Sequence, residues 1–169
     1  ELKTSALQAI LIALGLVLIY ITFRFQWRQG IAAIITLLHD VMVVVGIFSI
    51  FDKEFTLPVI AALLTVVGYS LNDTIVIFDR IRENISKFRK RELLPLINQS
   101  VTETLSRTLL TSGTTLMVVL ALVFLGGEII HDFAFALLVG VLIGTYSSIY
   151  VASPTVLWLT KIAPPKTSD

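Results

Sequence analysis

The sequence has no cysteine and has few charged residues for its length. The absence of cysteine from all 169 residues excludes disulfides, a thiol nucleophile and thiolate metal sites. Charged residues make up 15% of the chain, whereas hydrophobic residues make up 56%. A soluble domain of this size needs a polar shell, so the composition predicts a protein whose solvent is lipid.

Long apolar runs predict an all-α, polytopic transmembrane helix bundle. Each run has about 18 to 28 residues, enough to cross a hydrocarbon core of about 30 Å. A β-barrel would instead show alternation over segments of about ten residues. Five spans are expected in a single transmembrane domain over residues 1–169, near 6–23, 30–51, 55–78, 108–125 and 133–160.

Lysine and arginine gather in alternate loops, which predicts an orientation. Basic residues follow the first span, fill the segment 79–107 and follow the last span, whereas the other two loops hold one and none. Positive residues favour the cytoplasmic side, so we expect the C-terminus in the cytoplasm and the N-terminus of this sequence outside. Because the sequence begins at Glu1 without an initiator methionine, we also expect a fragment of a longer protein.

The segment 79–107 is expected to be a partly helical, basic cytoplasmic loop. Pro95 should interrupt it, and Ser100 and Glu103 have the spacing of a box that caps a helix leading into the fourth span. We interpret the segment as one that fixes topology and touches anionic lipid. A docking site for a cytoplasmic partner is the alternative.

Asp73 is the most informative residue, because it lies well inside the third apolar run. It is about 9 Å deeper than Asp79, at 1.5 Å per residue. A carboxyl group in such surroundings can bind and release a proton, as a transport relay requires. In the alternative, Asp73 stays neutral and hydrogen-bonds a neighbouring helix, on a packed polar face with Gly68, Ser70 and Asn72.

Arg107 opens the fourth apolar run. It is equally consistent with an interfacial arginine that extends to the lipid headgroups. However, its guanidinium could also reach the level of Asp73. Such an ion pair would keep Asp73 ionised until a rearrangement separated the two groups, which would couple proton uptake to a shape change.

His39 and Asp40 lie midway along the second run. Neighbouring residues on a helix point about 100° apart, so the two cannot both face one partner ideally. A part in the proton relay and plain hydrogen bonding between helices are both consistent with their positions. No metal site is expected, since His131 lies in an outer loop and ligand spacing is absent.

Small residues predict where helices pack closely. Gly140 and Gly144 form a Gly-x3-Gly pair in the last run. Gly113 lies among threonine and serine in the fourth run, and Gly68 and Ser70 precede Asp73. Small faces let two helices approach each other closely.

Four motifs resemble the SecF family of bacterial protein-export membrane proteins. The longest is GYSLNDTIVIFDRIREN at residues 68–84. The others are LHD at 38–40, TLSRT with TSGTT at 104–115, and GTYSSIYVAS at 144–153. The similarity extends along almost the whole chain, and the first motif is long enough to be highly specific.

The resemblance implies a proton-driven accessory subunit of the Sec machinery in the bacterial inner membrane, not an enzyme. Its architecture would resemble the resistance-nodulation-division transporters, with this chain as half of a twelve-helix assembly with SecD. In the family, the acid of the Asn-Asp motif and the arginine of the next helix serve proton-driven function; these correspond to Asp73 and Arg107. Asp40 also matches the family pattern, and the expected proton relay consists of Asp73, Arg107, Asp40, Asn72 and His39. The first helix and the extracytoplasmic domain expected before residue 6 are absent from this sequence.

Partners and alternatives follow from the same resemblance. The implied partners are SecD, the SecYEG translocon, YajC, YidC, membrane lipids and a preprotein bound by the missing domain, with no nucleic acid. No cofactor is expected beyond a coupling ion, either a proton or sodium. A proton-coupled efflux subunit for small hydrophobic compounds and a scaffold with purely structural polar residues remain alternatives. An enzyme is not expected, because the sequence shows no nucleophile–base pair or nucleotide loop.

Overall fold

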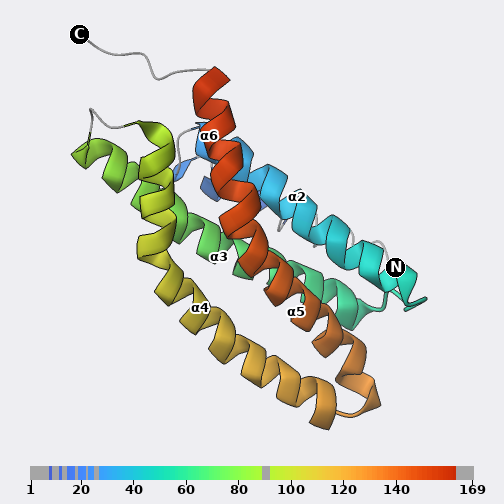
Figure 1. Cartoon of the computed structure of the whole chain (residues 1–169). Coiled ribbons are helices and arrows are strands. Elements are labelled where there is room, and N and C mark those ends of the chain that lie inside the picture. Colours follow the sequence, from blue (N-terminus) through green and yellow to red (C-terminus); the bar gives the residue numbers. More distant parts are fainter. Residues whose placement is uncertain are drawn as a thin grey trace.

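The computed structural model describes residues 27–88 and 92–162, together with a few positions between 8 and 24. All regular structure in this part is helical, which confirms the predicted fold class. The elements are α2 (Trp27–Ile50), α3 (Leu57–Lys87), α4 (Leu93–Leu125), α5 (Glu128–Ser147), the π-helical segment η1 (Ser148–Ala152) and α6 (Ser153–Ile162). The helices pack side by side as a bundle, and α6 continues the line of α5 (Figure 1).

Four helical segments of the described chain are long and apolar enough to cross a membrane. They are α2, α3, α4, and the continuous stretch Glu128–Ile162 formed by α5, η1 and α6. Large apolar side chains such as Met42, Leu110 and Phe124 are exposed on the outside of the bundle. Exposed apolar surface of this kind suits a lipid environment. The expected first span, residues 6–23, lies largely outside the described residues.

The segment 79–107 is mostly helical rather than a loop. Helix α3 continues to Lys87, well past the expected end of its span, and α4 already begins at Leu93. Pro95 lies in the first turn of α4, where a missing backbone N–H removes no helical hydrogen bond. It therefore starts a helix instead of interrupting one.

The expected cap at Ser100 and Glu103 is wrong. Ser100 lies inside α4, and its hydroxyl donates to the carbonyl of Leu96 at 2.7 Å. Glu92 occupies the N-cap position instead. The helix begins early because Leu96 and Ile97, in its first turns, are buried against the bundle, and burial of an apolar face stabilises a helix more than its caps do.

The last expected span also differs from the structure. Helix α5 begins at Glu128, directly after Gly127, whose φ of +74° favours glycine. The helix then changes to π-helix over Ser148–Ala152 before α6 continues it. Such segments are rare and occur frequently at functional sites.

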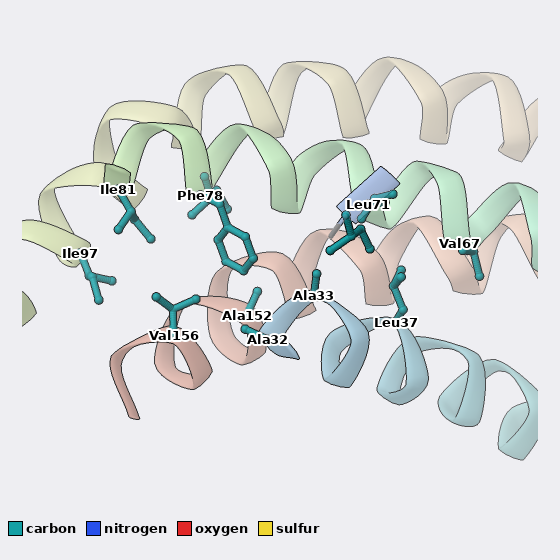
Figure 2. Close-up of a cluster of buried hydrophobic side chains, with 12 residues drawn as sticks. Ala32, Ala33, Leu37, Val67, Leu71, Phe78, Ile81, Ile97, Ala152 and Val156 are labelled. Carbon is teal, nitrogen blue, oxygen red and sulfur yellow. The ribbon is translucent and has the colours of Figure 1, made fainter. Parts of the chain in front are cut away.

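Two apolar clusters stabilise the bundle at different depths. The cluster in Figure 2 joins α2, α3, the start of α4, η1 and α6 through residues such as Ala33, Phe78 and Val156. The second cluster joins α2, α3, α4 and α5 around Phe48 and Val66. Along α2 and α5, the buried Asp40 and Ser147 lie between residues of the two clusters, and along α3 the buried Ser70, Asp73 and Thr74 lie among residues of the first cluster. The bundle therefore has a polar layer within its apolar interior.

Helices α3 and α5 approach each other most closely at two glycines. A Cβ added to Gly140 would overlap the side chain of Val66, and one added to Gly144 would lie 3.1 Å from Ser70 Cβ. At Gly68 and Gly113 an added Cβ would meet no described atom within 4 Å. Close helix packing inside the described chain therefore involves Gly140 and Gly144, while Gly68 and Gly113 leave open space.

Candidate functional site

Asp73 is buried in the polar layer, with only 3% of its surface exposed. Its carboxyl faces α4, where Arg107 acts on it through charge and Ser112 through its hydroxyl group. One carboxyl oxygen, Oδ2, has no hydrogen-bond partner within the described part of the chain. Buried polar atoms normally have partners, so an unpaired one at this depth indicates a functional group.

Arg107 lies on the exposed side of α4. It lines a hollow of about 350 Å³ between α3 and α4, together with Val76, Asp79, Arg80, Glu83, Glu103 and Thr104. Among the described residues it forms no ion pair with Asp73 within 4 Å. The arginine therefore attracts the carboxyl across a gap, and the ion pair suggested by the sequence stays a prediction.

Asp40 joins three helices within the same layer. It is 1% exposed and accepts hydrogen bonds from the Ser70 hydroxyl of α3 and, at 2.8 Å, from the Ser147 hydroxyl of α5. His39 Nδ1 lies 3.0 Å from the other carboxyl oxygen, so the adjacent pair interacts directly. Ser147 is a site residue that sequence reasoning missed; only its place in the motif at 144–153 could have indicated it.

A second set of hydroxyl groups links α3, α4 and α5. Tyr69 Oη donates to Ser112 Oγ at 3.1 Å, and Ser112 Oγ lies 2.7 Å from Thr145 Oγ1. Ser112 thus connects the surroundings of Asp73 to α5. Asn72, by contrast, lies on the exposed face of α3.

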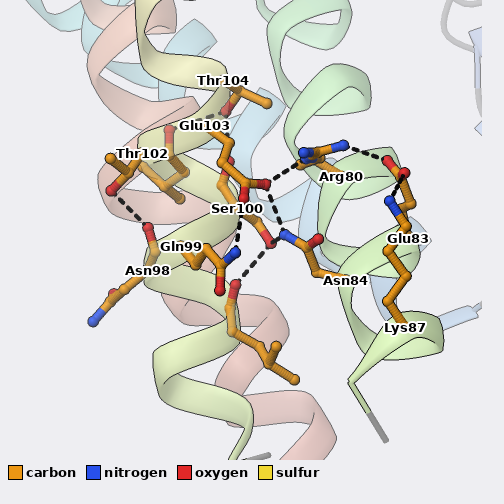
Figure 3. Close-up of polar contacts among 12 residues, drawn as sticks. Arg80, Glu83, Asn84, Lys87, Asn98, Gln99, Ser100, Thr102, Glu103 and Thr104 are labelled. Carbon is orange, nitrogen blue, oxygen red and sulfur yellow. Dashed lines mark hydrogen bonds and ion pairs between the residues drawn. The ribbon is translucent and has the colours of Figure 1, made fainter.

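A polar cluster joins α3 and α4 beyond the polar layer (Figure 3). The Arg80 guanidinium contacts the Glu103 carboxylate at 2.5 Å. The buried Asn84 amide donates to Ser100 Oγ at 2.9 Å and to Glu103 at 3.0 Å, while Gln99 donates to Glu103 at 2.8 Å. These contacts hold the end of α3 and the first half of α4 in a defined register. They thereby position Arg107, which lies one turn after Glu103 on α4.

No group of three or more metal-ligating side chains occurs within residues 27–88 and 92–162 or the described positions before them. The polar layer consists of single carboxyl groups surrounded by hydroxyl groups. This chemistry suits proton or small-cation handling better than tight binding of a transition metal.

Residues 1–162 match the sequence model of the family described as protein export membrane protein SecD/SecF, C-terminal. The chain belongs to this SecD/SecF family. It is 57% identical over 156 residues to protein translocase subunit SecF of Desulfurispirillum indicum, a match covering 90% of this chain and 50% of that protein. It is 53% identical over 157 residues to protein translocase subunit SecDF of Thermus thermophilus, covering 93% of this chain and 21% of that one.

The SecD/SecF fold is confirmed by a solved structure. The crystal structure of SecDF in its super-membrane-facing form matches with a TM-score of 0.88 at 52% identity, over 96% of this chain and 22% of that chain. The chain spans about half the length of the SecF relatives it matches. The resemblance to SecF drawn from the four motifs is therefore confirmed.

Proposed function

We propose that this chain is the membrane part of a SecF subunit that works with SecD, using the proton gradient to promote protein export through the Sec translocon. Family membership and identities above 50% to SecF proteins support this proposal. The observation that carries it is the buried Asp73, with an unpaired carboxyl oxygen and the charge of Arg107 nearby. A buried carboxyl group that only joins helices normally has hydrogen bonds to its oxygens, as Asp40 has.

Asp73 serves as the protonation switch, and Arg107 as its counter-charge. When ionised, the carboxyl group attracts the guanidinium of α4. When protonated, it does not, so the relative stability of two arrangements of α3 and α4 changes. A charge that crosses the membrane carries about 2.3 kcal/mol per 100 mV, enough to bias two arrangements of a helix bundle. The hollow beside Arg107 is also lined by Arg80 and Glu83, so their charges lie near the guanidinium of Arg107.

The exposed face of α3 is the proposed contact with SecD. Ala61, Thr65, Gly68 and Asn72 recur at helical spacing and are all exposed. Small and polar residues of this kind mark helix–helix interfaces in membranes rather than lipid-facing surface. A partner helix on this face would contact Asn72, the residue next to Asp73, so SecD could respond to the protonation state of Asp73.

The remaining partners and the orientation follow from the same assignment. The C-terminus and residues 79–92 would lie on the cytoplasmic side of the inner membrane, in contact with anionic lipid. SecYEG, YajC and YidC would be reached through the complete complex. The preprotein would meet the extracytoplasmic domain that lies outside this chain.

The decisive experiment measures proton flux in membrane vesicles that contain the complete SecD–SecF complex. Asp73→Asn should abolish proton flux and export stimulation while the complex still assembles, because the amide cannot bind and release a proton. Asp52→Asn is the matched control, since Asp52 is an exposed turn residue whose φ of 50° asparagine also tolerates. Wild-type flux in Asp73→Asn would overturn the proposal, and flux that requires sodium would change the coupling ion.

A further inference from the structure

Two buried threonines beside Asp73 differ from every other threonine in the described helices. Thr74 and Thr108 are each 1% exposed, and their hydroxyl oxygens have no hydrogen-bond partner among the described residues. The other threonines in these helices each donate to the carbonyl four residues earlier in their own helix: Thr36, Thr65, Thr102, Thr104, Thr111, Thr114, Thr115, Thr145, Thr155 and Thr160. The two exceptions therefore have hydroxyl groups that are not used by their own backbone.

The helix register places Thr74 beside the start of η1. Helices α3 and α5 run in the same direction here, because the close approach of Val66 to Gly140 is followed one turn later by that of Ser70 to Gly144. One further turn along both helices leads to Thr74 and Ser148. Ser148 is the first residue of the π-helical segment.

Thr108 approaches the same place from α4. Helices α4 and α5 form a hairpin and run in opposite directions, with Ser112 Oγ 2.7 Å from Thr145 Oγ1. One turn back along α4 is Thr108, and one turn forward along α5 is Ile149, within η1. By this register, Thr74 and Thr108 lie on two different helices near the level of η1.

Asp73 completes this junction. It precedes Thr74 on α3, and it interacts with Ser112, which lies one turn from Thr108. Three buried oxygens without partners in the described chain are therefore gathered at one level: Asp73 Oδ2, Thr74 Oγ1 and Thr108 Oγ1. Groups of buried polar atoms of this kind normally bind an internal water molecule, which needs two to four polar partners.

We propose that Asp73, Thr74 and Thr108 form an internal water-binding site at the junction of α3, α4 and η1, and that this water passes protons to and from Asp73. The proposal rests on the proposed proton-driven function. A hydroxyl group can both donate and accept, so the two threonines can hold a water in either state of the carboxyl group. On uptake, a hydronium ion that reaches the site gives a proton to this water as the water gives one of its own to Asp73 Oδ2, so one O–H bond forms and one breaks on the water, which stays neutral. Release is the reverse.

The test replaces each hydroxyl by a methyl group of nearly the same size. In vesicles with the complete SecD–SecF complex, Thr74→Val and Thr108→Val should each reduce proton flux, and the double variant should reduce it by about a hundredfold, the lower end of the range for loss of a positioned proton-transfer group. Thr74→Ser and Thr108→Ser, which retain the hydroxyl, should keep most of the flux. The matched controls are Thr36→Val, buried but bonded to Ala32, and Thr115→Val, on α4 and bonded to Thr111.

Several outcomes distinguish a water site from a structural role. If the two hydroxyl groups were buried without water, the valine variants would leave proton flux unchanged. They would also raise the melting temperature of the complex, because an unpaired polar group would have been removed. Wild-type flux in the double valine variant, with Asp73→Asn inactive, would overturn this inference and leave the proposed function intact. Wild-type proton flux in the Asp73→Asn variant would overturn the proposed function itself. If valine prevents assembly at either position, the alanine and serine variants make the same comparison.

Discussion

Individual polar residues in this bundle differ in whether their hydrogen bonds are complete. Asp40 accepts from Ser70 and Ser147 and contacts His39, so it has a full set of partners. Asp73 keeps one oxygen unpaired within the described chain. A fully bonded carboxyl holds helices together, whereas an incompletely bonded one can change its protonation state with less disruption of the fold. This difference favours Asp73 over Asp40 as the switch.

Substitution of Asp40 separates its two possible roles. Asp40→Ala should destabilise the bundle by about 2–4 kcal/mol, because it removes the carboxyl oxygen that accepts from two buried serine hydroxyls. Asp40→Asn keeps an acceptor and should cost less. Unfolding in detergent, with Asp52→Asn as an exposed control, measures the stability. Asp40→Asn with normal stability but no proton flux would instead place Asp40 in the relay.

Helices α3, α4 and α5 show how distant contacts alter local expectations. Proline at 95 and the Ser100–Glu103 spacing indicated an interruption and a cap, yet both lie inside α4. The buried Asn84 amide and the Arg80–Glu103 pair hold the extensions of α3 and α4 together. These contacts join residues 16 to 23 positions apart, so local sequence could not reveal them. The π-helix after Ser147 left no recognisable local signal either.

Gly140 sets the separation of α3 and α5. Gly140→Ala should destabilise the bundle by about 1–3 kcal/mol, because the new methyl group would overlap Val66. Combining it with Val66→Ala should recover part of this loss, as expected for two residues in contact. Thermal unfolding of the purified complex measures both effects. Gly46→Ala, where an added Cβ meets no described atom within 4 Å, is the control; equal effects at 46 and 140 would contradict the close packing.

The molecule as a whole has one face suited to lipid and another suited to a protein partner. Most of the outer surface carries large apolar side chains, whereas the face of α3 with Thr65, Gly68 and Asn72 is small and polar. The chain also covers only 22% of the SecDF chain whose fold it shares. A bundle with an exposed asparagine at the depth of its buried acid is therefore better explained as part of a larger assembly.

A bulky residue at Gly68 tests that face. Gly68→Leu should leave the stability of this bundle nearly unchanged, since an added Cβ would meet no described atom within 4 Å. It should, however, weaken co-purification with SecD severalfold by separating the two helices. Gly46→Leu, on the exposed side of α2, is the matched control. Normal co-purification of the Gly68 variant would move the SecD contact to another face.

Composition and local motifs were enough to predict the lipid solvent, the helical class, the SecF resemblance and the place of Asp73 inside an apolar helix. These properties depend on the length of the apolar runs, on composition and on local motifs, and all three involve residues that are close together in the sequence. The contact of Asp40 with Ser147, 107 residues away, and the burial of the Thr74 and Thr108 hydroxyl groups without partners in the described chain became visible only in the folded bundle. Such contacts depend on the register and rotation of packed helices, which are set by the summed packing of several faces at once.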